Sequence, residues 1–370
     1  MEARLSRRRF IAAASLAAGT TPVAACSRAG TTYAQAVAQT WRALPPGQRL
    51  EHRALQRELI RYATLAPSSH NTQCWNFKLE TARISILPDS TRRCPVVDPD
   101  DHHLFVSLGC ATENLVIASL AHGLHGEASF DPAAGPGVRI DFEPAKADPS
   151  PLFDAIPRRQ CTRGAYDGQP LEPAELRQLE AAASGPGVAV LFLTARAQVQ
   201  QVLDYVVEGN SAQLTDPAFM QELLQWIRFS DREAVAKGDG LFSRASGDPS
   251  VPRWLAAPLF NLLFTPKSDN EKYTKFIRSS AGIAVFVADA SDKEHWVETG
   301  RCYERFVLAA TAMGVRTAML NQPVEVAAVR PQFAAAIGIG KRRPDLVVRF
   351  GRGPEMPRSL RRPVDAVIIS

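Results

Sequence analysis

A run of polar residues from Ser68 to Gln73 (SSHNTQ) contains no large apolar side chain. Its hydroxyl and amide groups can donate and accept hydrogen bonds in several directions. Such groups, gathered where a helix gives way to a strand, are suited to binding a polar, planar ligand. An ordinary polar connection between two elements would have a similar composition, so the run alone is consistent with both interpretations.

Three arginines form a second candidate group, at Arg158, Arg159 and Arg163 in the stretch RRQCTR. A guanidinium group is permanently charged and forms paired hydrogen bonds, so arginine is the donor that a dianionic phosphate requires. The three occupy positions i, i+1 and i+5 around an expected strand-to-helix turn, and not all of them can face one ligand. We expect Arg158 and one other to do so, and a solvated basic patch is the alternative.

The elements on either side of the polar run are predicted from residue patterns. Apolar residues between Leu59 and Ala66 recur at helical spacing. Pro67 ends this helix because the residue before a proline is pushed out of the helical region. Residues 75–79 resume as a strand, and residues 83–87 (RISIL) alternate apolar and polar side chains as a partner strand would. The polar run therefore connects a helix to a strand.

A long apolar helix occurs twice in the sequence. Residues 107–124 form the first copy and residues 298–315 form the second, 191 positions later. At this offset a glycine (Gly109 and Gly300), a glutamate and several alanines are identical. Two copies indicate an internal duplication, although two buried helices rich in alanine could also be similar by chance.

The polar run and its flanks, APSSHNTQCW, resemble the APSxxNxQPW loop of the nitroreductase family of FMN-binding proteins, with Cys74 where proline is usual. RRQCTR resembles the RRSxR signature of that family, with Gln160 where serine is usual, and residues 349–353 (RFGRG) resemble its closing strand. The similarity extends to a subfamily of fused, two-halved proteins of the Acg type, over roughly residues 50–365. It implies an α+β nitroreductase fold in which two tandem nitroreductase-like halves form an intramolecular pseudo-dimer.

In this family each FMN takes its phosphate clamp from one subunit and its polar loop from the other. Here the first half has the loop but lacks the arginine signature near residues 51–57, whereas the second half has the signature but no Asn or Gln at residues 181–187. One complete FMN pocket per chain is therefore implied. The implied cofactor-binding residues are Pro67, Ser68, Ser69, Asn71, Gln73, Arg158, Arg159, Arg163, Gln322, Arg349 and Gly351. Arg361 and Arg362 are expected to be surface charges.

No side chain is expected to act as acid, base or nucleophile, because hydride passes to and from flavin N5 in this family. No metal site is expected either. His102 and His103 adjoin two aspartates in a turn-like stretch, but adjacent residues of a strand point to opposite faces, which disfavours joint ligation.

The N-terminal segment is predicted to be a targeting signal rather than part of the fold. Residues 6–11 (SRRRFI) resemble the twin-arginine export motif, and the run that follows, residues 12–25, is too short to span a bilayer stably. Residues 23–26 (VAAC) resemble a lipobox, which implies a lipid on Cys26, and simple cleavage near Ala25 is the alternative. The protein is therefore expected in the periplasm or cell envelope, with that lipid as its one membrane contact.

Composition describes a globular protein, with 45% hydrophobic and 22% charged residues. The net charge of +5 falls to about +2 without residues 1–25, because 39 basic residues then face 37 acidic ones. Charge therefore gives no support to nucleic-acid binding. The expected organisation is a signal at 1–26, a linker at 27–48, a first half at 49–150 and a second half at 151–370, with an insertion at about 200–266.

The insertion at about residues 200–266, called the lid segment below, resembles a segment that covers the flavin in the fused subfamily. A surface excursion packed on the core is the alternative. The resemblance as a whole implies a monomeric, FMN-dependent oxidoreductase that passes hydride from a reduced small-molecule donor to a nitroaromatic or quinone-like acceptor. The second hypothesis is a flavin-binding or flavin-sequestering protein with little turnover, since nicotinamides are scarce outside the cytoplasm, and the third is a scaffold without cofactor.

Overall fold

The computed structural model describes residues 31–44, 48, 50–132 and 135–369. From Tyr33 onwards the chain forms one compact unit. The predicted export signal and lipobox, residues 1–26, lie outside the described residues.

One sheet has five strands, in the order β11-β1-β2-β4-β3. Its strands are β1 (Trp75–Glu80), β2 (Arg83–Pro88), β3 (Leu124–Asp131), β4 (Gly137–Pro144) and β11 (Ile368–Ile369). Neighbouring strands are antiparallel, except that β11, from the end of the chain, pairs in parallel with β1. The predicted strands 75–79 and 83–87 are confirmed as β1 and β2, and the helix before them is α3 (His52–Thr64).

The second half contains a four-stranded antiparallel sheet with the order β5-β8-β10-β9. Its strands are β5 (Val188–Leu193), β8 (Gly282–Ala288), β9 (Arg316–Met319) and β10 (Leu346–Gly351). Strands β8 and β10 are buried along their whole length, which agrees with their nearly continuous apolar sequences.

Two long helices cross at the centre of this unit, α4 (His102–Ala121) and α13 (Lys293–Ala312). Their buried side chains form one core with residues of both sheets. Glycines permit the close crossing: a Cβ added to Gly109 would lie 1.9 Å from the oxygen of Val297, and one on Gly300 would lie 2.0 Å from the oxygen of Val106. Helix α4 is long and apolar enough to cross a membrane, but most of it is buried in this core.

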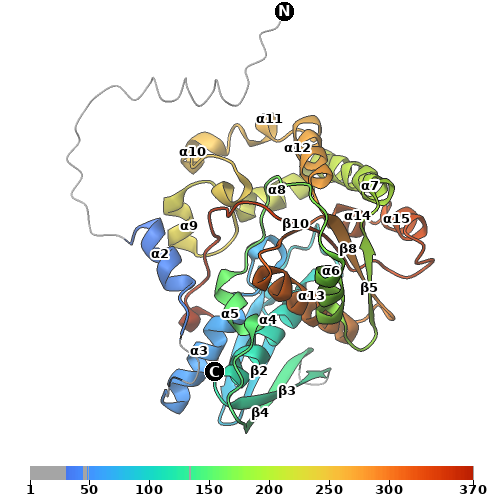
Figure 1. The fold of residues 1–370 in the computed structure, drawn as a ribbon. Coiled ribbons are helices and arrows are strands. Elements are labelled where there is room, and N and C mark those ends of the chain that lie inside the picture. Colours follow the sequence, from blue (N-terminus) through green and yellow to red (C-terminus); the bar gives the residue numbers. More distant parts are fainter. Residues whose placement is uncertain (1–30, 45–47, 49, 133–134, 370) are drawn as a thin grey trace, which may run out of the picture. The chain divides into compact units, whose positions relative to one another are not determined.

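The remaining helices are α2 (Tyr33–Thr40), α5 (Pro151–Ala155), α6 (Pro173–Ala183), α7 (Arg196–Thr215), α8 (Pro217–Trp226), α9 (Asp231–Lys237), α10 (Arg253–Ala256), α11 (Phe260–Leu263), α12 (Pro266–Arg278), α14 (Gln322–Glu325) and α15 (Arg330–Ala336). Two short parallel strands, β6 (Ile227–Arg228) and β7 (Leu241–Phe242), lie within the lid segment. Figure 1 shows α8 to α12 together on one side of the two sheets. Residues 33–40, predicted to belong to a linker, instead form α2, which packs against α9.

Candidate functional site

A cavity of about 330 Å³ brings the two predicted groups of residues together. The sequence-predicted residues that line it are Pro67, Ser68, Ser69, Asn71, Arg159, Arg163, Gln322 and Arg349. Gln73, Arg158 and Gly351 are absent from its lining. The cavity therefore joins the polar loop of the first half to arginines of the second half.

The polar loop has an unusual backbone. His70, Asn71 and Gln73 all have positive φ angles, of 47°, 53° and 53°, a region that residues other than glycine adopt at a cost. Side-chain hydrogen bonds hold this conformation. The Asn71 Nδ2 atom donates to the backbone oxygens of Gly240 (2.9 Å) and Leu360 (3.2 Å). Both amide hydrogens of Asn71 are therefore engaged, and its Oδ1 atom is the group left to contact a ligand.

Gln73 supports the loop from behind rather than lining the cavity. Its side chain is fully buried, donates from Nε2 to the oxygen of Gly238 at 2.9 Å, and accepts at Oε1 from the backbone N–H of Arg362 at 2.7 Å. The predicted contact between Gln73 and a cofactor is therefore replaced by an anchoring role, because its hydrogen-bonding groups are directed at two other segments of the chain.

Arg158 and Arg159 diverge although they are adjacent. Arg158 is exposed and donates from Nε to the backbone oxygen of Asp154 at 2.9 Å. Arg159 is buried, donates from Nη2 to the oxygen of Leu65 at 2.9 Å, and has its Nε atom 3.6 Å from Glu304 Oε1. Of the two, Arg159 lines the cavity and Arg158, which was expected to face the ligand, does not, because the tight turn that ends at Arg158 directs the two side chains apart.

Arg163 lines the cavity, and within the described residues no hydrogen bond or ion pair holds its guanidinium group. The positive charge of Arg163 acts on the neighbouring thiol of Cys161. Burial alone would raise the pKa of Cys161, but the charges of Arg163, Arg159 and Arg349 lower that pKa overall. A positive potential with an unpaired guanidinium group is suited to an anionic ligand.

Arg349 is almost fully buried and has a structural role at the cavity wall. It donates to the backbone oxygens of Phe276 (3.2 Å), Thr162 (3.0 Å) and Gly164 (2.7 Å). It therefore fixes the turn that carries Arg163. Gly351 lies two residues further along β10, outside the cavity lining, where a Cβ would come within 2.8 Å of the Tyr166 ring.

Three further cations line the cavity: Lys272, Arg358 and Arg361. Arg361, expected to be a surface charge, is buried and donates to the oxygens of Thr64, Leu65 and Ala66. These are the carbonyl groups left without partners where α3 ends. No local pattern indicates this contact, because the two segments lie about 300 positions apart.

Another part of the cavity wall carries amides and an acid. Asn321, Gln322 and Glu325 line it from α14 and the residue before it, and His103 lines it from α4. Asn321 Oδ1 accepts from the backbone N–H of Val347 at 3.0 Å, so its Nδ2 atom faces His103 Nε2 at 3.1 Å. Gln322 Oε1 is buried without a hydrogen-bond partner. Of these, Gln322 was the residue that the resemblance implied.

The lid segment gives the cavity an apolar wall, formed by Phe219, Leu223, Ile227, Leu241 and Phe264. It is fixed to the polar loop, since the N–H of Gly240 donates to the oxygen of Asn71 at 3.0 Å. Asp239 is buried between two arginines, Arg92 and Arg228, and its contact with Arg228 is 2.7 Å long. The lid segment is therefore an integral wall of this cavity.

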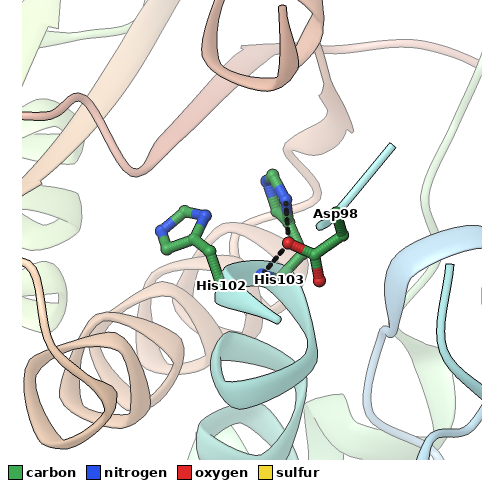
Figure 2. Close-up of side chains that lie close together, drawn as sticks. All are labelled: Asp98, His102 and His103. Atoms are coloured by element: carbon green, nitrogen blue, oxygen red, sulfur yellow. Dashed lines mark hydrogen bonds and ion pairs between the residues drawn. The ribbon is translucent and has the colours of Figure 1, made fainter. Parts of the chain in front are cut away.

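Asp98, His102 and His103 gather at the start of α4 (Figure 2), with possible ligand atoms within 4.8 Å of one another. The two histidines, expected in a turn-like stretch, instead open a helix, so the strand geometry used to argue against joint ligation does not apply. The Asp98 carboxylate accepts the backbone N–H groups of His103 (3.0 Å) and Leu104 (2.9 Å), and His102 Nε2 lies 2.9 Å from Asp345 Oδ1. These contacts cap the first turn of α4 and pair His102 with a carboxylate.

Comparison with known proteins finds matches that are named as nitroreductases. The model of the nitroreductase family matches residues 156–352, more than half of the chain. Two similar proteins of Mycobacterium tuberculosis are named as NAD(P)H nitroreductases. One (Rv3131) is 26% identical over 324 residues, which cover 84% of this chain and 90% of that protein. The other (acg) is 23% identical over 321 residues, which cover 84% of this chain and 94% of that protein.

Solved structures with a similar fold include NfnB from Mycobacterium smegmatis, an FMN-dependent nitroreductase in complex with NADPH. It has a TM-score of 0.36 and 13% identity, and the match covers 55% of this chain and 87% of that one. A nitroreductase with bound FMN from Bacteroides fragilis has a TM-score of 0.33 and 12% identity, with coverage of 55% and 88%.

Proposed function

Because the chain belongs to the nitroreductase family, we propose that it is an FMN-binding oxidoreductase that uses a reduced nicotinamide to reduce a nitro- or quinone-type acceptor. The observation that carries this proposal is the single cavity that unites the polar loop around Asn71 with Arg159 and Arg163. The names of the similar proteins, NAD(P)H nitroreductases, support the nicotinamide as donor.

The residues of the cavity fit FMN. Arg163 has no partner among the described residues, so its guanidinium group can donate to a phosphate, and Arg159 adds a positive charge to the cavity wall. Asn71 Oδ1 and the unsatisfied Gln322 Oε1 can accept hydrogen bonds from the ring system or the ribityl chain. When bound, FMN would supply hydride transfer, and the protein's contribution is to orient the ligand and control access to it.

We further propose that the two halves are an intramolecular pseudo-dimer that binds one FMN. The contacts between α4 and α13 support this. Gly109 approaches Val297, whereas Gly300 approaches Val106, and each residue of the first contact is related to one of the second by the same offset of 191 positions. Such reciprocal contacts are typical of a two-fold axis. A protein whose pseudo-partner is in its own chain is expected to be a monomer.

The sequestering alternative is favoured by one specific observation. The lid segment forms one wall of the cavity and is held by the buried carboxylate of Asp239 between two arginines. A wall held in this way restricts the entry of a nicotinamide more than a hinged loop would.

A reconstitution experiment tests the main proposal. The purified protein is loaded with FMN, the flavin-to-protein ratio is measured, and the holoprotein is titrated anaerobically with NADH and NADPH. One flavin per chain and loss of the yellow absorbance with either donor would support the oxidoreductase. One flavin per chain with unchanged absorbance would support sequestration, and a colourless protein would contradict both.

We also propose export by the twin-arginine route with a lipid on Cys26, motivated by the residues at 6–11 and 23–26. Replacing Arg7 and Arg8 by lysine should retain the protein in the cytoplasm. Replacing Cys26 by serine should release an otherwise membrane-associated protein into the soluble fraction, and unchanged fractionation of both variants would refute the proposal.

A further inference from the structure

The cavity lining contains a carboxyl group that no proposed binding contact uses. Glu325 lines the cavity at the end of α14 and is partly accessible there. Gln213 of α7 donates from Nε2 to Glu325 Oε2 at 2.6 Å. Within the described residues the other oxygen, Oε1, has no hydrogen-bond partner, so the side chain is held by one atom and presents the other.

The surroundings of Glu325 oppose its ionisation. Burial, together with the charges of Asp98 and Glu222, raises the pKa of Glu325, and the opposing effects of His103 and Gln213 are smaller. Tyr273 and Cys94 are the other titratable groups whose charge is coupled to this carboxyl group.

His103 opposes this effect, since its positive charge is the largest of the influences that lower the pKa of Glu325. Burial lowers the pKa of His103, but the Asp98 carboxylate beside it raises that pKa overall. The burial of Glu325 nevertheless outweighs the charge of His103, so the pKa of Glu325 is raised.

The cavity lining thus contains two kinds of ionisable group. Arg159 and Arg163 favour an anion, whereas burial favours the neutral, protonated form of Glu325. A cavity lined in this way can bind a phosphate through its arginines and donate a proton from Glu325.

Resting on the proposed function, we propose that Glu325, as a carboxylic acid, donates the proton that accompanies hydride transfer to the acceptor. A quinone that receives a hydride, two electrons with one proton, needs one further proton on oxygen to become the hydroquinone. In this step the O–H bond of Glu325 breaks and an O–H bond of the product forms. The Glu325 carboxylate then recovers a proton from water.

Two acceptors separate proton donation from other effects. Glu325→Gln keeps the shape and can still pair with Gln213, but it has no acidic proton. We expect reduction of 1,4-benzoquinone to slow about 100-fold, the lower range for general acid catalysis. Reduction of ferricyanide, which takes electrons without a proton, should stay within about twofold, and Glu325→Asp should partly restore the quinone rate. Equal losses with both acceptors, or no loss with either, would overturn the proposal.

A matched control and an independent readout complete the test. Glu208→Gln removes an exposed carboxyl group on α7, outside the cavity lining, and should change neither rate. In the protein without flavin, a carboxyl ¹³C NMR titration should show a resonance with a raised pKa that disappears in Glu325→Gln. An ordinary pKa for Glu325 would overturn the inference even if FMN binds. A raised pKa in a protein that cannot bind FMN would instead identify the proposed function as the part that fails.

Discussion

Replacing Arg163 by alanine should separate phosphate binding from folding. Arg163 makes no hydrogen bond or ion pair within the described residues. Burial lowers the pKa of Arg349, and repulsion from the charge of Arg163 lowers it further. The free energy of unfolding of the protein without flavin should therefore change by less than about 0.5 kcal/mol. A charge-assisted hydrogen bond contributes about 1.5–3 kcal/mol, so the affinity for FMN should fall roughly 10- to 100-fold.

Riboflavin provides the control ligand, because it has the same ring system and ribityl chain without the phosphate. Both affinities can be measured by titration of flavin fluorescence. Arg163→Ala should weaken FMN binding and leave riboflavin binding unchanged. Equal loss for the two ligands, or no loss for FMN, would refute the assignment of Arg163 to the phosphate.

Arg349→Ala is the contrasting variant. It removes a donor from three backbone oxygens, of which Phe276 and Thr162 keep hydroxyl donors from serine and tyrosine side chains. The oxygen of Gly164 has no other partner within the described residues, and a buried group left unsatisfied costs about 1–3 kcal/mol. We expect this variant to be destabilised, so a change in its flavin affinity could not be assigned to a lost phosphate contact. Arg163→Ala is therefore the better probe.

Three further predictions concern the helix crossing, the buried acid and the polar loop. Gly109→Ala should destabilise the protein by about 3 kcal/mol, the upper range for overpacking, because its Cβ would meet the backbone oxygen of Val297 at 1.9 Å. Urea denaturation measures this loss of stability. The control Gly164→Ala should be nearly neutral, because its Cβ would have an ordinary contact at 3.5 Å. Burial raises the pKa of Glu304 to about 7, so its folded form favours the proton, and stability should fall as pH rises from the ordinary glutamate value toward 7. The stability advantage of Glu304→Gln should therefore grow between pH 5 and pH 8, and a constant difference would contradict this cause. Asn71→Ala removes two hydrogen bonds, one to Gly240 of the lid segment and one to Leu360. It should therefore speed amide hydrogen exchange at residues 238–240 and leave exchange in β8 unchanged.

Local sequence patterns were sufficient to predict the elements beside the polar loop. Alternating and apolar residues identified β1 and β2, and the proline identified the end of the helix before them. The cavity also contains most of the residues that the resemblance implied. These features depend on short segments, whose periodicity and turn residues determine their conformation.

The failures concern residues whose surroundings come from distant segments. Arg158 and Arg159 have the same type and adjacent positions, and only the turn geometry and the carbonyl group of Leu65 distinguish them. Gln73 looked like a ligand-binding amide because the residues that engage it, at Gly238 and Arg362, lie far away in the sequence. No local pattern encodes such contacts.

The glutamates at equivalent positions of α4 and α13 have different surroundings. Glu113 forms ion pairs with Arg301 and Arg305 of α13, at 2.9 Å and 3.0 Å. The positions 191 residues before these arginines are Cys110 and Asn114, so the first half offers no such charges to Glu304. Glu304 instead lies 3.6 Å from Arg159, with both carboxyl oxygens unsatisfied.

In the proposed pseudo-dimer, two equal flavin sites would require similar surroundings for both glutamates. Glu113 forms ion pairs with arginines of α13, whereas Glu304 lies next to Arg159, which lines the cavity. This asymmetry favours one flavin per chain. A measured ratio of two would refute that stoichiometry, even if Arg163 proved to bind the phosphate as proposed.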